Sequence, residues 1–259
     1  MERRLLSLII LVFSAFSVFS QAPSQIDQLR IQVWADLDPF PGVFSESESE
    51  TADAKNESKN TALKETSDVE ENSEQSLKEK IFHQKFDFAI DRTKEISPFL
   101  IAGMLDGWSF EYTPYDKTRR VDEYWEFNQL VPFNKDVNQL TFNSPKVEED
   151  RLVCWVYCNR TESQKRNYKA WTSIVHPHIH GKGTGSVQDG FKGIQDAVSE
   201  AAKNAVRDYW RIYIKNKPKE ISGKVLLIRD PRIYISSGQY VVDLDFFLET
   251  DRIVSYNYY

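Results

Sequence analysis

Residues 185–218 read GSVQDGFKGIQDAVSEAAKNAVRDYWRIYIKNKP, and they decide the fold because they contain the clearest helix signal in the chain. Ser186 is a favourable N-cap residue, and Lys217-Pro218 ends the pattern. Between them, apolar residues recur at spacings of three and four, as on one face of a helix: Val187, Phe191, Ile194, Val198, Ala201, Ala205, Tyr209 and Ile212. We therefore predict a long amphipathic helix at about residues 187–215.

Small residues mark one part of this helix, and glycines come just before it. Gly190, Gly193, Ala197 and Ala201 keep the helix narrow, which would let it lie close against a sheet. Residues 181–185, GKGTG, are expected to be a flexible approach to the helix. Their free N–H groups could instead hold an anion, but the residue order matches neither the P-loop nor the dinucleotide fingerprint.

The chain after the helix favours β-structure. Short runs rich in β-branched and aromatic residues alternate there with turn residues, which is typical of an antiparallel meander: 224–228, 232–235, 240–248 and 252–258. Because side chains alternate between the faces of a strand, Asp243 and Asp245 lie on the face opposite Val242 and Leu244. The sequence therefore predicts an α+β fold, an antiparallel sheet with a C-terminal β-meander and one face covered by the long helix.

Upstream of the long helix the pattern is more mixed. Residues 29–35 and 108–112 read as strands, and residues 152–158 and 168–175 are expected to form a hairpin around a polar connection. Ser97-Pro98 reads as the N-cap and first residue of a short apolar helix that ends before Gly107, with an extended run as the alternative.

The N-terminus reads as a secretory signal. Met1 to Arg4 is basic, and residues 5–19 form an apolar stretch of 15 residues. This is the length of a signal core and too short for a helix that spans about 30 Å of bilayer. We predict a signal peptide at residues 1–20, which is cleaved, with an uncleaved N-terminal anchor as the alternative.

Composition divides the rest of the chain into three parts. Residues 21–44 hold the first strand segment. Residues 45–80 are acidic, polar and free of aromatic residues, so we expect a disordered acidic linker, with a helix near residues 67–80 as the alternative. Residues 81–259 are long enough for a single α+β domain.

Charge and hydropathy narrow the classes of partner. The net charge of −6 repels phosphate backbones, so nucleic acid is not expected as a partner. Beyond the signal no apolar run approaches 18 residues, so no membrane span is expected once the signal is removed. The expected location of the mature chain is the periplasm, the cell envelope or the extracellular space.

Three of the four histidines fall within five residues, at His176, His178 and His180. In an extended segment their side chains point to one face, and zinc or copper would suit such ligands. His83 and Asp189 are the additional ligands that the sequence offers. We nevertheless favour a solvated loop over a metal site, because no carboxylate within about eight residues offers a further ligand. The sequence contains no cofactor motif.

Two other pairs invite a chemical interpretation. Cys154 and Cys158 are the only cysteines, and on a straight strand they lie about 13 Å apart, beyond disulfide reach. We predict that both are unpaired, unless the segment bulges or is helical. Asp243 and Asp245 could form an acid–base pair, but they fit the wet face of a strand better, where Arg232 could pair with one of them.

The sequence therefore favours an exported, non-catalytic protein that binds a partner or ligand, either an envelope protein or an extracellular molecule. The alternative is a metal-binding protein or metal-dependent hydrolase that uses His176, His178 and His180. A glycan-binding module is a third hypothesis, and it would need exposed tryptophans at residues better suited to a core: Trp108, Trp125, Trp155 and Trp171.

Overall fold

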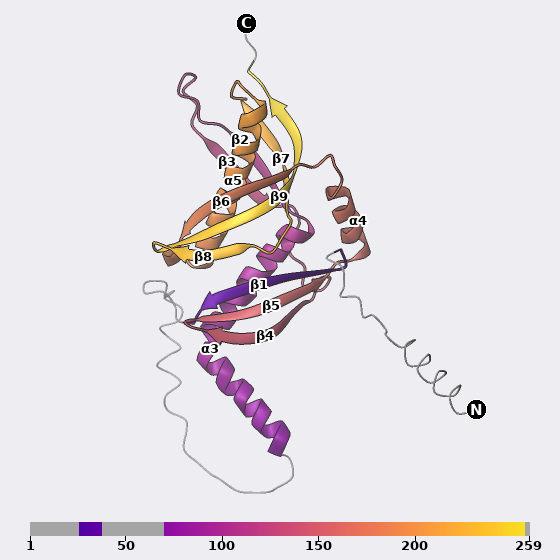
Figure 1. The fold of residues 1–259 in the computed structure, drawn as a ribbon, viewed down its shortest axis with the longest axis vertical. Coiled ribbons are helices and arrows are strands. Elements are labelled where there is room, and N and C mark those ends of the chain that lie inside the picture. Colours follow the sequence, from indigo (N-terminus) through magenta and orange to yellow (C-terminus); the bar gives the residue numbers. More distant parts are fainter. Residues whose placement is uncertain (1–25, 38–69, 257–259) are drawn as a thin grey trace, which may run out of the picture.

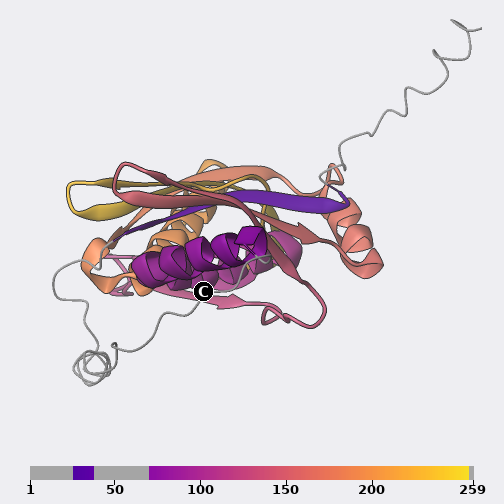
Figure 2. The ribbon, with the colours of Figure 1, turned by 90° about the horizontal axis from the view of Figure 1, so that it is seen from below.

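The structure, a computed structural model, describes residues 26–37 and 70–256, with side chains from residue 86 onward in the second range. It has the α+β architecture that the sequence predicts, with two antiparallel sheets (Figure 1). Helix α3 (Glu70–Leu105) contacts strands of both sheets. Figure 2 shows β1 (Gln28–Asp36) and the C-terminal strands above α3 and α5 (Phe191–Tyr213). No helix within the described ranges is long and apolar enough to cross a membrane.

Helix α5 follows the predicted boundaries closely. A 3₁₀ turn, η2 (Val187–Asp189), precedes it, and Gly190 joins the two with a φ of 55°. Ser186 caps this 3₁₀ turn, because its side chain accepts from the backbone N–H of Gln188. The central part of the predicted apolar stripe is buried, from Ile194 to Ala205, whereas Ile212 near the end of the helix is 77% exposed. The small residues of α5 lie against the sheet.

The glycine-rich segment before α5 is a strand, so the expectation of a flexible approach is wrong. Strand β6 (His178–Ser186) pairs with β9 (Gln239–Val254). A Cβ atom added to Gly181, Gly183 or Gly185 would lie within 2.1 Å of a backbone oxygen of α5. These glycines therefore let the strand and the helix touch along their backbones, which is a packing role.

The six-stranded sheet has the order β3-β2-β7-β9-β6, and β8 also pairs with β9. Its other strands are β2 (Trp108–Thr113), β3 (Tyr124–Gln129), β7 (Glu220–Leu227) and β8 (Arg232–Ser236). Strands β7 and β8 follow one another along the same edge of β9, because β6 occupies the opposite edge. The C-terminal strands are antiparallel, as predicted, but they do not form a simple meander.

Strand β9 does not break at residues 249–251, where the sequence predicts a turn. Lys224 on β7 lies 3.5 Å from Glu249 and 3.4 Å from Asp251 in ion pairs across the sheet surface. The predicted turn corresponds to a bulge: Ser222 pairs with Arg252 and Gly223 with Thr250, so Asp251 is an extra residue of β9 in the register with β7. The polar residues belong to the exposed face of a long strand.

The three-stranded sheet has the order β1-β5-β4, with β4 (Leu140–Glu148) and β5 (Arg151–Asn159). Strand β1 confirms the prediction for residues 29–35, and its pairing with β5 joins the N-terminal strand segment to the folded region. The predicted hairpin with residues 168–175 is wrong, since helix α4 (Glu162–Trp171) follows β5. Thr161 and Gln164 form a capping box at its start, a signal that explains the helix.

Helix α3 corrects two further predictions. Ser97 does not begin a helix: it lies inside α3, where its buried Oγ donates to the carbonyl oxygen of Thr93 at 2.5 Å. Pro98 is accommodated within the helix, and the kink falls at Phe86. Residues 70–80, expected in the disordered linker, are the first turns of α3, as in the helical alternative. The signal peptide and residues 45–69 lie outside the described residues.

Candidate functional site

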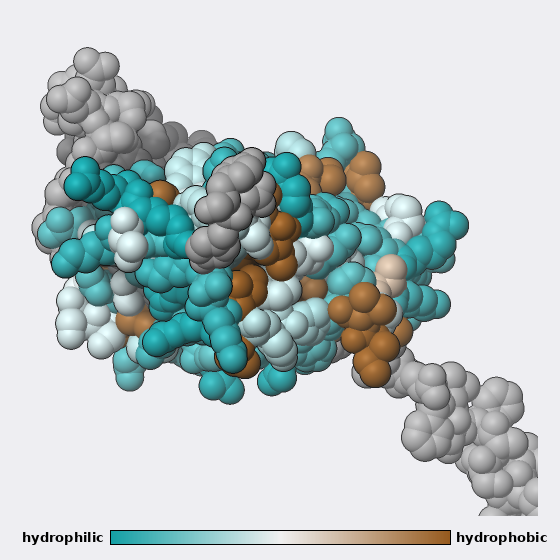
Figure 3. Space-filling model, turned by 90° about the horizontal axis from the view of Figure 1, so that it is seen from above, coloured by the Kyte–Doolittle hydropathy of each residue, from teal (hydrophilic) through white to brown (hydrophobic). Residues whose placement is uncertain are grey.

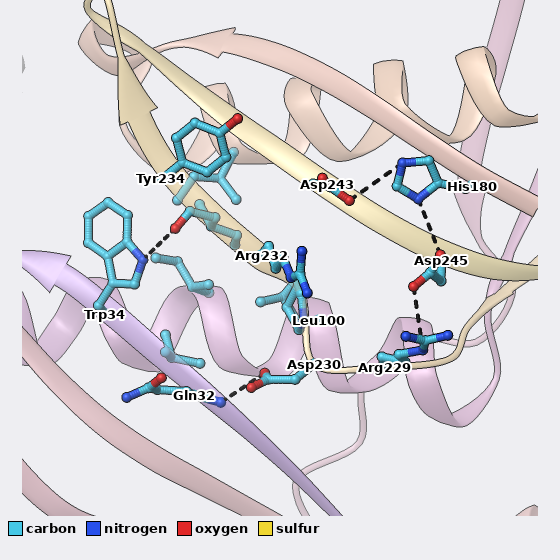
Figure 4. Close-up of a pocket in the computed structure, with 15 residues that line it drawn as sticks. Gln32, Trp34, Leu100, His180, Arg229, Asp230, Arg232, Tyr234, Asp243 and Asp245 are labelled. Atoms are coloured by element: carbon cyan, nitrogen blue, oxygen red, sulfur yellow. Dashed lines mark hydrogen bonds and ion pairs between the residues drawn. The ribbon is translucent and has the colours of Figure 1, made fainter.

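A cleft lies between neighbouring edges of the two sheets. It has a volume of about 740 Å³, within the usual range for ligand sites, and runs between β1 and β8. Its base is formed by Ile96 and Leu100 of α3 and by Ile194 of α5. Polar side chains of β6, β8 and β9 continue the site onto the outer face of the larger sheet (Figure 4).

One edge of β1 faces this cleft. The N–H of Gln32 donates to Asp230 Oδ1 at 2.9 Å, across the cleft and away from β5. The odd-numbered residues point the other way. The Leu37 N–H donates to the Asp150 carbonyl oxygen, and the Asp27 carbonyl oxygen accepts from the Arg160 N–H, both on the β5 side. Alternation along the strand therefore directs the backbone groups of the even-numbered residues of β1 into the cleft: Arg30, Gln32 and Trp34.

Two side chains cross the gap between the sheets. Asp230 accepts the Gln32 N–H from the β8 side, and Trp34 donates its indole N–H to the carbonyl oxygen of Ile233 at 3.0 Å. The guanidinium of Arg151 lies 4.0 Å from the Trp34 ring centroid and supports it from the β5 end. Burial raises the pKa of the Asp230 carboxyl, while the bond from Gln32 and the charge of Arg30 act in the opposite direction.

A chain of charged side chains lies on the outer face beside the cleft (Figure 4). His180 Nδ1 is 3.2 Å from Asp245 Oδ1, and His180 Nε2 is 3.6 Å from Asp243 Oδ1. Asp245 also pairs with Arg229 Nε at 3.5 Å. The aspartates lie on the wet face of β9, as predicted, and the imidazole lies between their two carboxylates. Arg232 lies opposite Asp243 in the strand register, whereas the arginine in an ion pair with these aspartates is Arg229.

The other predicted metal ligands do not join His180. The His176 ring lies 4.8 Å from that of Trp171, and the His178 ring packs edge-on against Phe247 at 4.5 Å. Within residues 26–37 and 86–256, no three His, Cys, Asp or Glu side chains are arranged to hold a metal ion. Asp189 lies in η2, and the His83 side chain is outside the described residues. This arrangement does not favour the metal-binding alternative.

A second cavity of about 410 Å³ continues the site along the first residues of β1 and shares Arg229 and Asp230 with the cleft. The Arg30 guanidinium lies 3.7 Å from the Trp155 ring centroid. Arg160 is 5% exposed, donates to the carbonyl oxygen of Met104 at 2.9 Å, and lies over the Tyr168 ring. Sequence reasoning missed this arginine cluster, because its members come from three separated segments.

The remaining sequence candidates belong to the core. Cys154 and Cys158 are buried and unpaired on β5, which confirms the prediction from strand geometry. Trp108 and Trp171 are buried, and Trp125 is partly buried against Phe110 and Phe127. Figure 3 shows one end of the molecule as largely hydrophilic, with apolar side chains in small separate patches.

A family model matches residues 16–256, which is most of the chain. The chain belongs to that family, a domain of unknown function. It is also similar to a protein of Treponema pallidum (strain Nichols) described as uncharacterized, with 25% identity over 166 residues. The similar region covers 64% of this chain and 70% of that protein. No solved structure matches the chain.

Proposed function

We propose that the protein is an exported, non-catalytic binding protein that holds its partner or ligand in the cleft between β1 and β8. The observation that carries the proposal is the cleft, which combines an apolar base with polar walls and an edge of β1 that pairs with no other strand of the described residues. Such a combination of apolar surface and a few directed polar groups is typical of ligand sites.

The charged chain beside the cleft supports binding more than catalysis. Both ring nitrogens of His180 face carboxylates, at 3.2 and 3.6 Å. Only Nδ1 lies within hydrogen-bond distance of a carboxylate, and the described residues that line the cleft include no Ser, Thr or Cys that Nε2 could activate as a nucleophile. The contacts of His180 suit a role in fixing the shape and charge of the binding surface.

Export rests on residues 1–20, with their basic start and apolar core. The expected location is the periplasm, the cell envelope or the extracellular space. The test is N-terminal sequencing of the protein purified from its source cells, after fractionation. A mature start after Ser20 or Ala22 outside the cytosol supports export, whereas cytosolic protein that still begins at Met1 contradicts it.

Binding in the cleft can be tested by photo-cross-linking. Tyr234 lines the cleft and is 39% exposed, so a benzoylphenylalanine placed there would sample its contents. Tyr124 on β3 is 51% exposed and lies outside the cleft lining, which makes it a matched aromatic control. We expect a cross-linked species from position 234 and none from position 124 when each variant meets an envelope extract. Equal labelling at both positions would refute the cleft as the site.

A further inference from the structure

We propose that the occupant of the cleft is an extended, acidic polypeptide segment that pairs with β1 as an added strand. This inference rests on the proposed function, because it names the class of partner for the same site. It follows from the backbone groups along β1, the way other edges are covered, and the charges at one end.

The edge of β1 opposite β5 pairs with no other strand of the described residues, and its backbone repeat fits a polypeptide. The Gln32 N–H faces the cleft, and strand alternation directs the backbone groups of Trp34 into the cleft and those of Arg30 toward the second cavity, at intervals of about 6.6 Å. Another extended backbone repeats its donors and acceptors with the same spacing. A small molecule could bond to one or two of these groups, but a strand matches all of them, as in β-augmentation.

Two other edge strands, β6 and β4, carry protection of their backbone groups, whereas the contacts that cross the β1 edge among the described residues come from Asp230 and Trp34. On the outer edge of β6, Glu200 accepts the Thr184 N–H at 2.6 Å, and Asn204 donates to the Lys182 carbonyl oxygen at 2.8 Å. Strand β4 contains Pro145 within a register irregularity. Proteins use such devices to prevent unwanted strand pairing. On β1 an acidic side chain covers the Gln32 N–H, and the edge borders two cavities.

The surroundings of the edge select alternating side chains. A strand between β1 and β8 would direct every second side chain toward the apolar base formed by Ile96, Leu100 and Ile194. The intervening side chains would face outward, beside His180 and Asp243. The preferred segment therefore alternates apolar and polar residues.

Charge selects an acidic segment. The charged residues that line the second cavity are Arg30, Arg160, Arg229 and Asp230, three positive groups and one negative. The Arg30 guanidinium lies 3.7 Å from the Trp155 ring centroid, so a carboxylate that enters this cavity would meet a positive group held against an aromatic face. Guanidinium groups bind carboxylates through directed, charge-assisted bonds. We place an acidic side chain or the C-terminal carboxylate of the segment at this end.

The Asp230 carboxylate occupies one hydrogen-bonding position that the added strand would use. Its Oδ1 occupies the Gln32 N–H that a carbonyl oxygen of the incoming segment would use. Binding must displace this carboxylate and open the Trp34–Ile233 bond that also crosses the gap. Asp230→Ala removes the first of these obstacles and should strengthen binding several-fold. Gln32→Pro should weaken it about tenfold, because proline removes the donor. Since the Gln32 N–H points away from β5, the proline leaves the β1–β5 hydrogen bonds in place, as edge positions allow.

The experiment uses the mature full chain and a displayed library of random decapeptides, from which binders are selected and synthesised. Binding is measured by titration for the wild type, Gln32→Pro and Asp230→Ala. Gln32→Thr is the matched control, since it loses the same side chain but keeps the backbone N–H. Thermal melting checks that each variant folds. Synthetic peptides N-methylated at single positions then report which amides pair with β1.

The expected result is a set of acidic peptides with alternating polarity, weakened about tenfold by Gln32→Pro and little by Gln32→Thr. N-methylation of the peptide should abolish its binding to the protein when it falls on one set of alternate residues and should have little effect on the residues between them. Failure to select any peptide, or equal loss for proline and threonine, overturns the inference. A non-peptide molecule cross-linked at Tyr234 would overturn it and leave the proposed function standing. If Tyr234 and Tyr124 are labelled equally, the proposed function fails as well.

Discussion

Replacement of Gly183 by alanine tests the packing that positions β6, and with it the charged surface beside the cleft. A Cβ at this position would lie 2.1 Å from the Ala197 carbonyl oxygen and 2.4 Å from the Ala201 nitrogen. Ordinary contact begins near 3.4 Å, so the added methyl falls about 1.3 Å short of the space it needs. Both obstructing atoms belong to the α5 backbone, which cannot turn aside as a flexible side chain can.

The helix or the strand must therefore shift, and β6 is already bonded to β9 along its length. Overpacking of a dense core costs about 1–3 kcal/mol, occasionally more, and an obstruction by backbone belongs at the upper end. We expect Gly183→Ala to lower the free energy of unfolding by about 3 kcal/mol, with a fall in Tm of about 6–12 °C for a domain of this size. Urea unfolding followed by tryptophan fluorescence and circular dichroism measures both.

Gly238 supplies the matched control. A Cβ there meets nothing within 4 Å, but its φ is +73°, so Gly238→Ala carries only the backbone strain of about 1–2 kcal/mol. If Gly183→Ala lowers the free energy of unfolding no more than Gly238→Ala does, the glycines of β6 are not required for its close contact with α5. That result would refute the reasoning.

Three further predictions use other parts of the fold. Burial raises the pKa of the Cys154 and Cys158 thiols to about 11, so below pH 9 almost no thiolate is present. Ellman's reagent should therefore react slowly with both thiols in the folded protein, faster as pH rises toward 11, and at once in denaturant; rapid reaction at pH 8 would contradict their burial. Thr161→Ala removes the cap of α4 and should cost about 1 kcal/mol, whereas Thr161→Ser should restore most of it in the same unfolding assay. Trp34→Phe keeps an aromatic ring but loses the bond to the Ile233 carbonyl, and should cost about 1 kcal/mol. It should also speed amide hydrogen exchange in β8, and unchanged exchange there would show that the indole bond does not join the sheets.

Local patterns were reliable where one periodicity ran through many residues. The 3.6-residue period predicts α5 almost to its ends, because burial of one helix face requires apolar residues at those intervals. The rise of a strand, about 3.3 Å per residue, separates Cys154 from Cys158 on β5. The two-residue alternation of a strand places Asp243 beside Asp245 on the wet face of β9.

Local patterns failed where one residue type serves two structures. The glycines of β6 resemble a flexible loop, and only their contact with α5 reveals a strand. Ser97-Pro98 has the form of a helix start, but the preceding residues are helical too, and Ser97 bonds back to Thr93. Residues 168–171 have strand-like composition, yet the capping box at Thr161 and Gln164 begins a helix that includes them.

The sequence alone determined the α+β class, the long helix with its small-residue face, and the separation of the two cysteines, because each depends on residues close together in the chain. The tertiary structure decided the site. Gln32 and Asp230 are 198 positions apart, and His180 meets Asp245 across 65 positions. No local pattern records such pairs, since they meet only after α3 and α5 draw the strands of two sheets side by side.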